Sequence, residues 1–149
     1  MKKTTMTLVR GIPGSGKSTL AKDICDYTRA VHLEADMYFV HDSAYLFDPK
    51  WIGAAHDWCK KAADIQLTNG HSVVVSNTFT TIKELRPYFE IALEHGIIPS
   101  VVLLQNDYGS IHDVPDETIT KMKQRFVYDI SSLISEFKDR FDFESKETV

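Results

Sequence analysis

A short segment near the start of the chain matches a phosphate-binding loop. Residues 11–18 read Gly-Ile-Pro-Gly-Ser-Gly-Lys-Ser, which fits the pattern G-x-x-x-x-G-K-[ST]. Glycine at positions 11 and 16 lets the backbone turn its N–H groups inward around a phosphate. Lys17 can reach the outer phosphate oxygens, and the Ser18 hydroxyl suits Mg²⁺. The motif therefore restricts the chain to folds in which a strand, this loop and a helix follow one another.

The segments on either side of the loop have the required character. Residues 5–9 form a short run that becomes apolar, as a buried strand does, and residues 18–27 carry apolar side chains at helical spacing. A helix that begins at the loop directs the positive end of its dipole at a bound phosphate. We therefore predict a nucleotide site at Gly11, Pro13, Gly14, Ser15, Gly16, Lys17, Ser18 and Thr19.

Strands and helices alternate along the whole chain, which predicts an α/β fold with a parallel sheet covered on both faces. Expected strands lie at 5–9, 31–35, 72–76 and 97–104. Expected helices run over 18–27, from Pro49 to Asn69-Gly70, from a capping box at Thr81 to about Gly96, and from Pro115 through Phe137. The second of these is expected to bury Ile52, Ala55, Ala62, Ala63, Ile65 and Leu67.

Ligands of an open parallel sheet bind outside the carboxyl ends of its strands. The expected strands end at the phosphate loop, at Asp36, at residues 76–78 and at Gln105. These segments should therefore border one crevice, and the chemistry should lie there.

Asp36 is the candidate general base, because a carboxylate at this edge can hold and deprotonate a hydroxyl in line with a phosphoryl group. An alternative is that Asp36 only caps its own loop. Strand alternation places Glu34 on the same face but deeper, which favours a structural or supporting role.

Other polar and aromatic residues could contribute to a substrate site. Asn77 and Ser76 can hold a substrate oxygen or a water of a Mg²⁺ shell, or they can satisfy their own turn. Asn77 and Thr78 are candidate substrate-binding residues, as is Phe39. His56 lies in a predicted helix and either lines the substrate site or is structural. The aromatic segment 37–48 could stack on a base or sugar, or cover the sheet edge. The six histidines are scattered and predict no metal-ligand cluster.

The bulk properties fit one domain of a cytoplasmic protein, spanning residues 1–141, with a frayed tail at 142–149. The net charge of −4 argues against broad binding of duplex nucleic acid, but not against a local pocket for one nucleic-acid end. Two cysteines fall on different predicted helices and are expected to be reduced thiols. No run suits a membrane span or a signal peptide, and we expect a monomer or weak homodimer.

Taken together, the motifs resemble the small P-loop kinase domain of phage-type polynucleotide 5′-hydroxyl kinases and the AAA-like small ATP-binding proteins grouped with them. The resemblance covers about residues 6–126, in the segments GIPGSGKSTLA, LEADMYF, AAHDWC, NGHSVVVSNTFT, ELRPY and IHDVPDETITKMKQRF. It implies a three-layer P-loop NTPase fold with four or five parallel strands, Mg-ATP as phosphoryl donor, Lys17 and Ser18 on the phosphates and metal, and Asp36 as base. The acceptor would lie near the residues after Asp36 and near Asn77.

The chain departs from that pattern in three places. Phe39 replaces an arginine that grips the substrate phosphate, segment 76–78 lacks an aspartate, and segment 105–114 contains no arginine or lysine. A missing cationic clamp can reduce the rate by about 10³-fold or more. Two main readings therefore stay open: a kinase acting on a nucleic-acid end, nucleotide or small molecule, and a nucleotide-binding module or slow NTPase. A structural protein with a vestigial loop is the third. Cations that could replace the clamp are Arg86, Lys121 and Arg125.

Overall fold

The computed structural model describes residues 3–109 and 114–147. A four-stranded parallel sheet forms its centre, with the strands in the order β2-β5-β1-β6. The strands are β1 (Met6–Arg10), β2 (Val31–Leu33), β5 (Val73–Asn77) and β6 (Ser100–Leu103). The predicted α/β class and the parallel sheet are confirmed.

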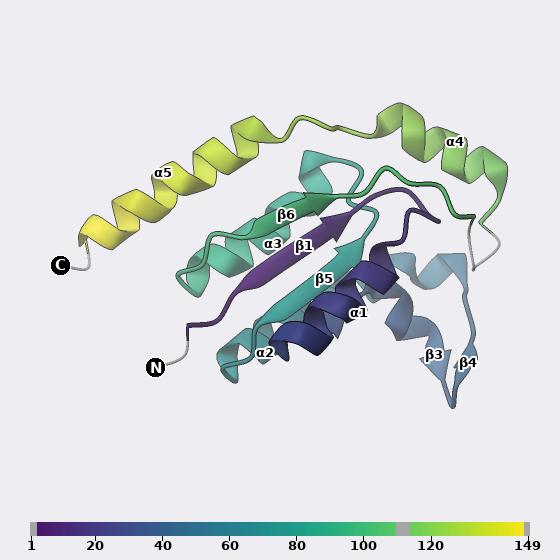
Figure 1. Cartoon of the computed structure of the whole chain (residues 1–149), viewed down its shortest axis with the longest axis horizontal. Helices are drawn as coiled ribbons and strands as arrows, with labels where there is room; N and C mark the ends of the chain where they lie inside the picture. Colours follow the sequence, from purple (N-terminus) through teal and green to yellow (C-terminus); the bar gives the residue numbers. More distant parts are fainter. Residues whose placement is uncertain (1–2, 110–113, 148–149) are drawn as a thin grey trace.

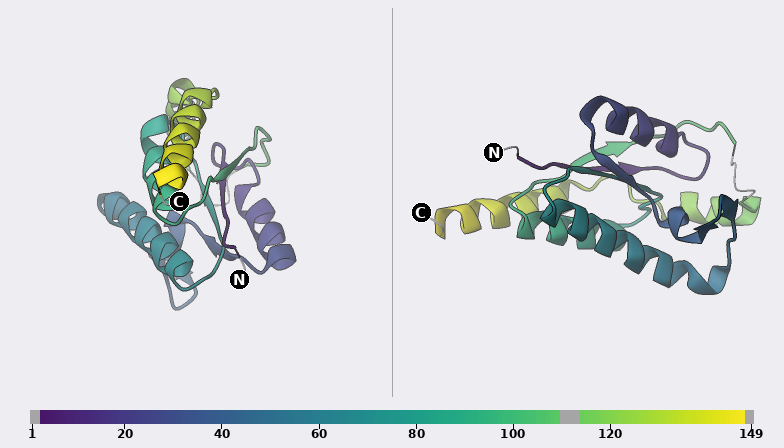
Figure 2. Two further views of the ribbon diagram at one scale, coloured as in Figure 1. Left: turned by 90° about the vertical axis from the view of Figure 1, so that its left-hand side faces the viewer. Right: turned by 90° about the horizontal axis from the view of Figure 1, so that it is seen from below.

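Helices cover both faces of this sheet. The helix α1 (Lys17–Thr28) lies on one face, and α2 (Ile52–Thr68) and α3 (Ile82–Glu94) lie on the other (Figures 1 and 2). The helix α5 (Ser131–Glu147) packs against α3. The result is the three-layer arrangement expected of a phosphate-loop protein.

The central strand β5 is buried along its whole length, which explains its continuous apolar sequence. Val73 and Val75 belong to the larger core beneath α2, α3 and α5. Val74 points to the opposite face and packs with Val9 and Ala21 beneath α1. Two-residue alternation thus divides one strand between two cores.

Local sequence signals give most of the helix ends correctly. Thr81 and Glu84 form the predicted capping box at the start of α3. Gly70 follows the end of α2 with φ 85°, a conformation that favours glycine. Pro49 opens a short 3₁₀ turn, η2 (Pro49–Trp51), that leads into α2.

The predicted buried face of α2 is wrong at two positions. Ile52 and Ile65 are exposed, at 42% and 57% of their surface. The prediction is confirmed for Ala55, Ala63 and Leu67, and α2 also buries Cys59. These residues are mainly small, and they allow the helix to approach the sheet closely.

The single C-terminal helix predicted from Pro115 onward is also wrong, because the structure divides it into α4 (Asp116–Arg125) and α5. Phe126 has extended backbone angles, and the N–H of Val127 donates to the carbonyl of Thr80. The side chain of Asp129 then accepts from the N–H of Ser131 at 3.0 Å. A backbone bond to another segment therefore replaces helical bonding at the break. The helix α5 continues to Glu147, into the segment expected to fray.

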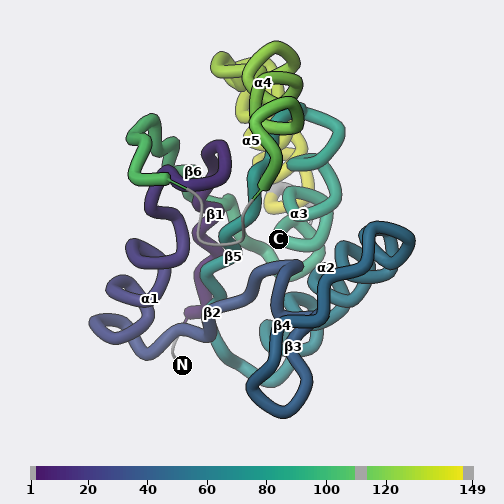
Figure 3. Tube along the Cα trace, turned by 90° about the vertical axis from the view of Figure 1, so that its right-hand side faces the viewer, coloured from purple at the N-terminus to yellow at the C-terminus, as the bar shows by residue number. Residues whose placement is uncertain are grey.

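The aromatic segment after β2 is more ordered than an irregular loop. It contains a 3₁₀ turn, η1 (Ala35–Phe39), and a small hairpin formed by β3 (Val40–His41) and β4 (Ala44–Tyr45). The hairpin turn places Asp42 and Ser43 at φ 50° and 68°. Two consecutive residues with positive φ suit a tight hairpin turn. The hairpin projects beyond the main sheet (Figure 3).

Among residues 3–109 and 114–147, no helix combines the length and apolar character needed to cross a bilayer. Cys25 and Cys59 are both free thiols.

One buried cation joins the end of β1 to the break between α4 and α5. Arg10 is only 1% exposed. Its guanidinium donates to the carbonyl of Phe79 at 2.7 and 3.0 Å and to that of Val127 at 2.6 Å. The same group lies 4.4 Å from the centre of the Phe126 ring. Arg10 therefore provides the donors for two carbonyl groups that belong to separate connections.

We expect Arg10→Met to lower the free energy of unfolding by about 2–4 kcal/mol, because a buried acceptor that loses its donor keeps its desolvation cost. Urea denaturation measures the change. Arg140→Met is the control, since Arg140 forms an exposed ion pair with Glu90 and should contribute little. Equal effects of the two substitutions would show that the Arg10 bonds do not anchor the fold.

Candidate nucleotide-binding site

The phosphate loop leaves β1 and closes on itself before α1 begins. The N–H of Gly11 donates to the carbonyl of Thr78 at 3.2 Å, and the N–H of Ser15 donates to the carbonyl of Ile12 at 3.2 Å. Gly14 and Gly16 have φ of 85° and 93°. A side chain at either position would be strained, which explains the glycines of the motif.

Gly11 is required by close packing rather than by its φ angle. A Cβ atom at this position would lie 2.5 Å from the Oγ of Ser15 and 2.6 Å from the carbonyl oxygen of Leu104. Ser15 is itself fully buried, and its Oγ has no hydrogen-bond partner within the described residues. Ser15 thus packs beneath the loop, against Gly11.

The loop presents several backbone donors that the protein does not use. In the described part of the chain, no protein acceptor is found for the N–H groups of Gly14, Gly16, Lys17 and Ser18. Thr19, which follows them, is exposed in the first turn of α1. Free N–H groups at a helix start, with the helix dipole behind them, form a site for a phosphate.

Lys17 lies inside the same site in a partly desolvated position. Its ammonium donates to the carbonyl of Ile12 at 3.0 Å. Burial lowers the pKa of Lys17 to about 8, although the carboxylates of Glu34 and Asp36 oppose the shift. The ammonium is therefore held among carboxylates but has lost much of its hydration, so a phosphate that replaces water would stabilise its charge.

A cluster of oxygen atoms adjoins the start of α1. The Ser18 hydroxyl donates to Glu34 Oε2 at 2.8 Å, and the Ser76 hydroxyl donates to the same oxygen at 3.1 Å. His32 Nε2 lies 2.7 Å from the Ser76 Oγ. Because Ser76 donates to Glu34, its bond with His32 requires the Nε2–H tautomer. Burial lowers the pKa of His32, which favours this neutral form.

Glu34 is closer to the phosphate loop than the sequence suggests. The sequence predicts a strand that continues to Ala35, with Glu34 deep within it. The strand β2 ends at Leu33, so Glu34 lies at its carboxyl end and reaches Ser18. Strand alternation indicates that Glu34 and Asp36 share a face, but the sequence does not show that the strand ends before Glu34.

Asp36 lies in η1, directly after Glu34 and Ala35. Its Oδ1 accepts from the Tyr45 hydroxyl at 3.1 Å. Burial, together with the charge of Asp36, raises the pKa of Tyr45, so the phenol stays protonated and continues to donate. Tyr45 of the hairpin therefore helps to orient this carboxylate.

Asn77 fixes the backbone that carries Asp36. Its Oδ1 accepts from the N–H of Ala35 at 2.9 Å, and its Nδ2 lies 3.8 Å from Cys59 Sγ. Both ends of this buried amide are therefore engaged within the protein. Thr78 contributes its carbonyl to Gly11, which joins the end of β5 to the phosphate loop.

Two other predicted substrate residues lie apart from the loop. Phe39 is 4% exposed and packs among the rings of Tyr38, Tyr45 and Phe47. His56 is half-buried on α2, and no contact with the loop is found among the described residues.

The cations considered as substitutes for a clamp are bound elsewhere. Arg125 Nε donates to Thr80 Oγ1 at 3.0 Å. Lys121 pairs with Glu117 on α4 at 3.3 Å, and Arg86 pairs with Glu136 at 2.6 Å. In this conformation none of these three donates to the phosphate loop.

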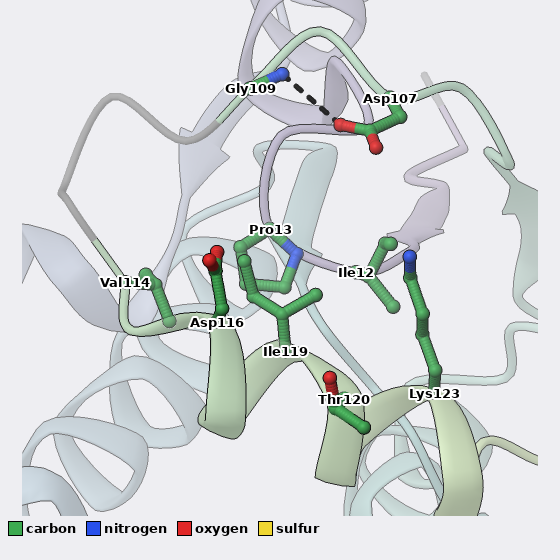
Figure 4. Close-up of a pocket in the computed structure, with 9 residues that line it drawn as sticks. All are labelled: Ile12, Pro13, Asp107, Gly109, Val114, Asp116, Ile119, Thr120 and Lys123. Atoms are coloured by element: carbon green, nitrogen blue, oxygen red, sulfur yellow. Dashed lines mark hydrogen bonds between the residues drawn. The ribbon is translucent and has the colours of Figure 1, made fainter.

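A cavity of about 470 Å³ lies between the outer side of the loop and α4. Figure 4 shows the Lys123 side chain extending toward Ile12, while Ile119 of the same helix faces Pro13. Lys123 is thus a cation beside the phosphate loop that the sequence did not indicate, because its position depends on where α4 docks.

The donor set near Ser18 suits a magnesium ion. Mg²⁺ prefers oxygen ligands and is usually held by one or two carboxylates together with substrate phosphates and waters. The hydroxyl of Ser18 and the carboxylate of Glu34 offer such oxygens. No group of three or more His, Cys, Asp or Glu side chains arranged for a metal occurs in the described residues, so any metal there would also need ligands from the nucleotide.

The parallel sheet, the phosphate loop and the open N–H groups define a P-loop domain with a kinase-like fold. Residues 6–111 match the family model described as "AAA domain" (AAA_33), and the chain belongs to this family. The predicted grouping with AAA-like P-loop proteins is confirmed at this level. The chain is also 33% identical over 138 residues to human NEDD4-binding protein 2. The match covers 82% of the chain but only 8% of that much longer protein.

Two solved structures share the fold. A chain of the Pnkp1/Rnl/Hen1 RNA repair complex superposes with a TM-score of 0.56 at 18% identity, over 99% of this chain and 47% of that one. The Mycobacterium tuberculosis APS kinase CysC superposes with a TM-score of 0.56 at 15% identity, over 84% of this chain and 98% of that one. These similarities establish the kinase-like fold.

The pKa of Lys17 predicts a pH dependence of nucleotide binding. The protonated ammonium is the form that attracts phosphate, so ATP affinity should be highest below pH 8 and should fall as pH rises through that value. The limiting slope is about tenfold per pH unit. Isothermal titration calorimetry with ATP and a chelator measures it. Lys17→Arg, which stays charged, should give a flat profile; an equally steep decline in that variant would assign the titration to another group.

Proposed function

We propose that this chain is a polynucleotide kinase-like phosphotransferase that moves the γ-phosphate of ATP to a hydroxyl acceptor. The observation that carries the proposal is the link between the phosphate loop and the segment that carries Asp36: Ser18, next to Lys17, donates to Glu34 at 2.8 Å, two residues before Asp36. The charges of Glu34 and Asp36 both act on the Lys17 ammonium. The proposed phosphate-binding cation and the proposed base would therefore share one site. The acceptor would be a nucleic-acid end, a nucleotide or a small molecule.

The binding half of the site would hold the nucleotide phosphates. The N–H groups of Gly14, Gly16, Lys17 and Ser18 would donate to phosphate oxygens, and the Lys17 ammonium would neutralise charge on the transferring group. Mg²⁺, when bound, would neutralise negative charge that develops on the phosphates. Ser18 and Glu34 would hold the metal.

The transfer half would depend on Asp36. Its carboxylate would accept the proton of the acceptor hydroxyl while the new oxygen–phosphorus bond forms, and the bond between the γ-phosphorus and its bridging oxygen would break to release ADP. Tyr45 and Asn77 would act as positioning residues, because one orients the carboxylate and the other fixes the backbone that carries it.

The acceptor would approach from the side of the β3–β4 hairpin. Phe47 is 48% exposed and stacks on Tyr45, with ring centres 6.2 Å apart, and Tyr45 in turn donates to Asp36. Aromatic rings of this kind can contact a base or a sugar. This surface, and the similarity of fold to a chain of an RNA repair complex, support a nucleic-acid end as acceptor.

A nucleotide-binding module with little transfer is the second candidate. It is favoured by the arginines and lysines that are engaged away from the loop, notably Arg125 on Thr80. Segment 105–114 also contains no arginine or lysine. Such a module would bind ATP and act through a partner.

Asp36→Asn separates these candidates. For a kinase, it should lower transfer from γ-labelled ATP by about 10²-fold or more while leaving ATP affinity nearly unchanged, since the amide cannot accept the proton. The acceptors to test are 5′-hydroxyl DNA and RNA oligonucleotides, nucleosides, nucleotides and water. Asp42→Asn, in the exposed hairpin turn, is the matched control.

Label that moves to one acceptor class and is lost in Asp36→Asn identifies the kinase and its substrate. Retained transfer in that variant would place the base elsewhere. Tight ATP binding with no transfer to any acceptor would reject the kinase in favour of the binding module.

Glu34→Gln should raise the Mg²⁺ concentration needed for half-maximal ATP binding by about 10-fold or more, because a residue that orients a metal shell commonly contributes 10- to 100-fold to affinity. The glutamine keeps the size of the side chain and removes its charge. Calorimetry of ATP binding at a series of Mg²⁺ concentrations measures the shift. Asp26→Asn on the exposed side of α1 removes the same charge and should have no effect; a similar shift in both variants would indicate only a general loss of negative charge.

A further inference from the structure

The segment after β6 packs directly on the phosphate loop. The N–H of Leu104 donates to the carbonyl of Arg10 at 2.9 Å, and the N–H of Tyr108 donates to the carbonyl of Gly14 at 2.7 Å. A Cβ atom on Gly14 would lie 2.8 Å from the backbone of Gly109. The two segments therefore lie side by side at the carboxyl edge of the sheet (Figure 3).

Tyr108 projects from this segment over the start of α1. Its ring lies 3.4 and 3.6 Å from the position of a Cβ atom on Gly16, whose N–H is one of the open donors. Asp107 and Gly109 line the cavity on the other side of the segment, but Tyr108 does not. The ring therefore faces the phosphate loop, and the residues on either side of Tyr108 line the cavity.

The ring is exposed although its backbone is held. Tyr108 is 76% exposed, and its side chain has no hydrogen bond or ring contact with the rest of residues 3–109 and 114–147. The carboxylate of Asp107 accepts from the N–H of Gly109 at 3.2 Å, which closes a tight turn around Tyr108. Packing within the fold does not explain why an aromatic ring occupies this place.

We propose that Tyr108 provides the stacking surface for the base of a nucleotide whose phosphates bind residues 14–18. The proposal rests on nucleotide binding as proposed above, and does not require phosphoryl transfer. A phosphate held at the N–H of Gly16 lies next to the ring, and the ribose and base follow within the length of one mononucleotide. An aromatic face stacks on any base, so this contact serves ATP and GTP alike.

The test compares nucleotides with inorganic triphosphate, which has no base. Calorimetry on the whole chain with Mg²⁺ should show that Tyr108→Ala weakens both ATP and GTP about tenfold or more, within the range for loss of a base–aromatic stack. Triphosphate binding should stay unchanged. Tyr108→Phe and Tyr108→Trp should retain ATP affinity, because stacking needs the ring and not the hydroxyl. Tyr27→Ala is the control, since Tyr27 is 95% exposed near the far end of α1.

Three results would overturn the proposal. The first is unchanged ATP affinity in Tyr108→Ala, and the second is an equal loss of affinity for ATP and triphosphate in that variant. The third is a loss of ATP affinity in Ile119→Ala but not in Tyr108→Ala, which would place the base in the cavity. An equal loss would assign Tyr108 to support of the loop. Lys17→Ala tests the site itself, because it should weaken ATP and triphosphate together. Unchanged binding of both ligands in Lys17→Ala would reject the phosphate-loop assignment whatever Tyr108 does.

Discussion

The parallel pairing of β1 with β5 determines where the functional residues lie. Their register sets Arg10 opposite Asn77, so the first glycine of the phosphate loop meets the carbonyl of Thr78. Asn77 then accepts from Ala35, which fixes the backbone before Asp36. A slip of one residue would exchange the two faces of β5 and separate the loop from the candidate base, but the different apolar cores on the two faces oppose it.

Lys17 is the residue at which stability and function conflict. Its ammonium has lost much of its hydration, and a carbonyl is its hydrogen-bond partner. Nearby carboxylates offset part of that cost, but they would also repel an arriving phosphate. The ammonium has few polar partners in the free protein and would gain them from a bound phosphate. Its position before binding therefore costs free energy of folding and favours phosphate binding.

The sequence predicts the features of the fold that depend on local chemistry. Three features lie where the sequence predicts them, because each depends only on its own residues: the phosphate loop, the apolar run 73–75 and the capping box at Thr81. The break at Phe126 could not be predicted, because it depends on a backbone bond from Val127 to Thr80 and on stacking with Arg10. The position of Glu34 likewise depends on where β2 ends, and the position of Tyr108 depends on where its loop docks. Both are set by tertiary structure.

The charges at the site bear on how a nucleotide would enter. Lys17 contributes one positive charge, while Glu34 and Asp36 contribute two negative charges when ionised, and the whole chain carries −4. A polyphosphate alone would therefore meet a site that is negative on balance, and the domain adds no long-range attraction.

A divalent cation would change this balance, because both the phosphates and the carboxylate of Glu34 would attract it. Segment 76–78 at the end of β5 contains no carboxylate, and Ser76 there donates to Glu34, which follows the neighbouring strand β2. Glu34 would thus provide the negative charge for the metal from the end of β2, next to Ser18. The same arrangement would make nucleotide and metal binding mutually dependent, because the metal would relieve the repulsion between phosphates and carboxylates, and the phosphates would add ligands for the metal.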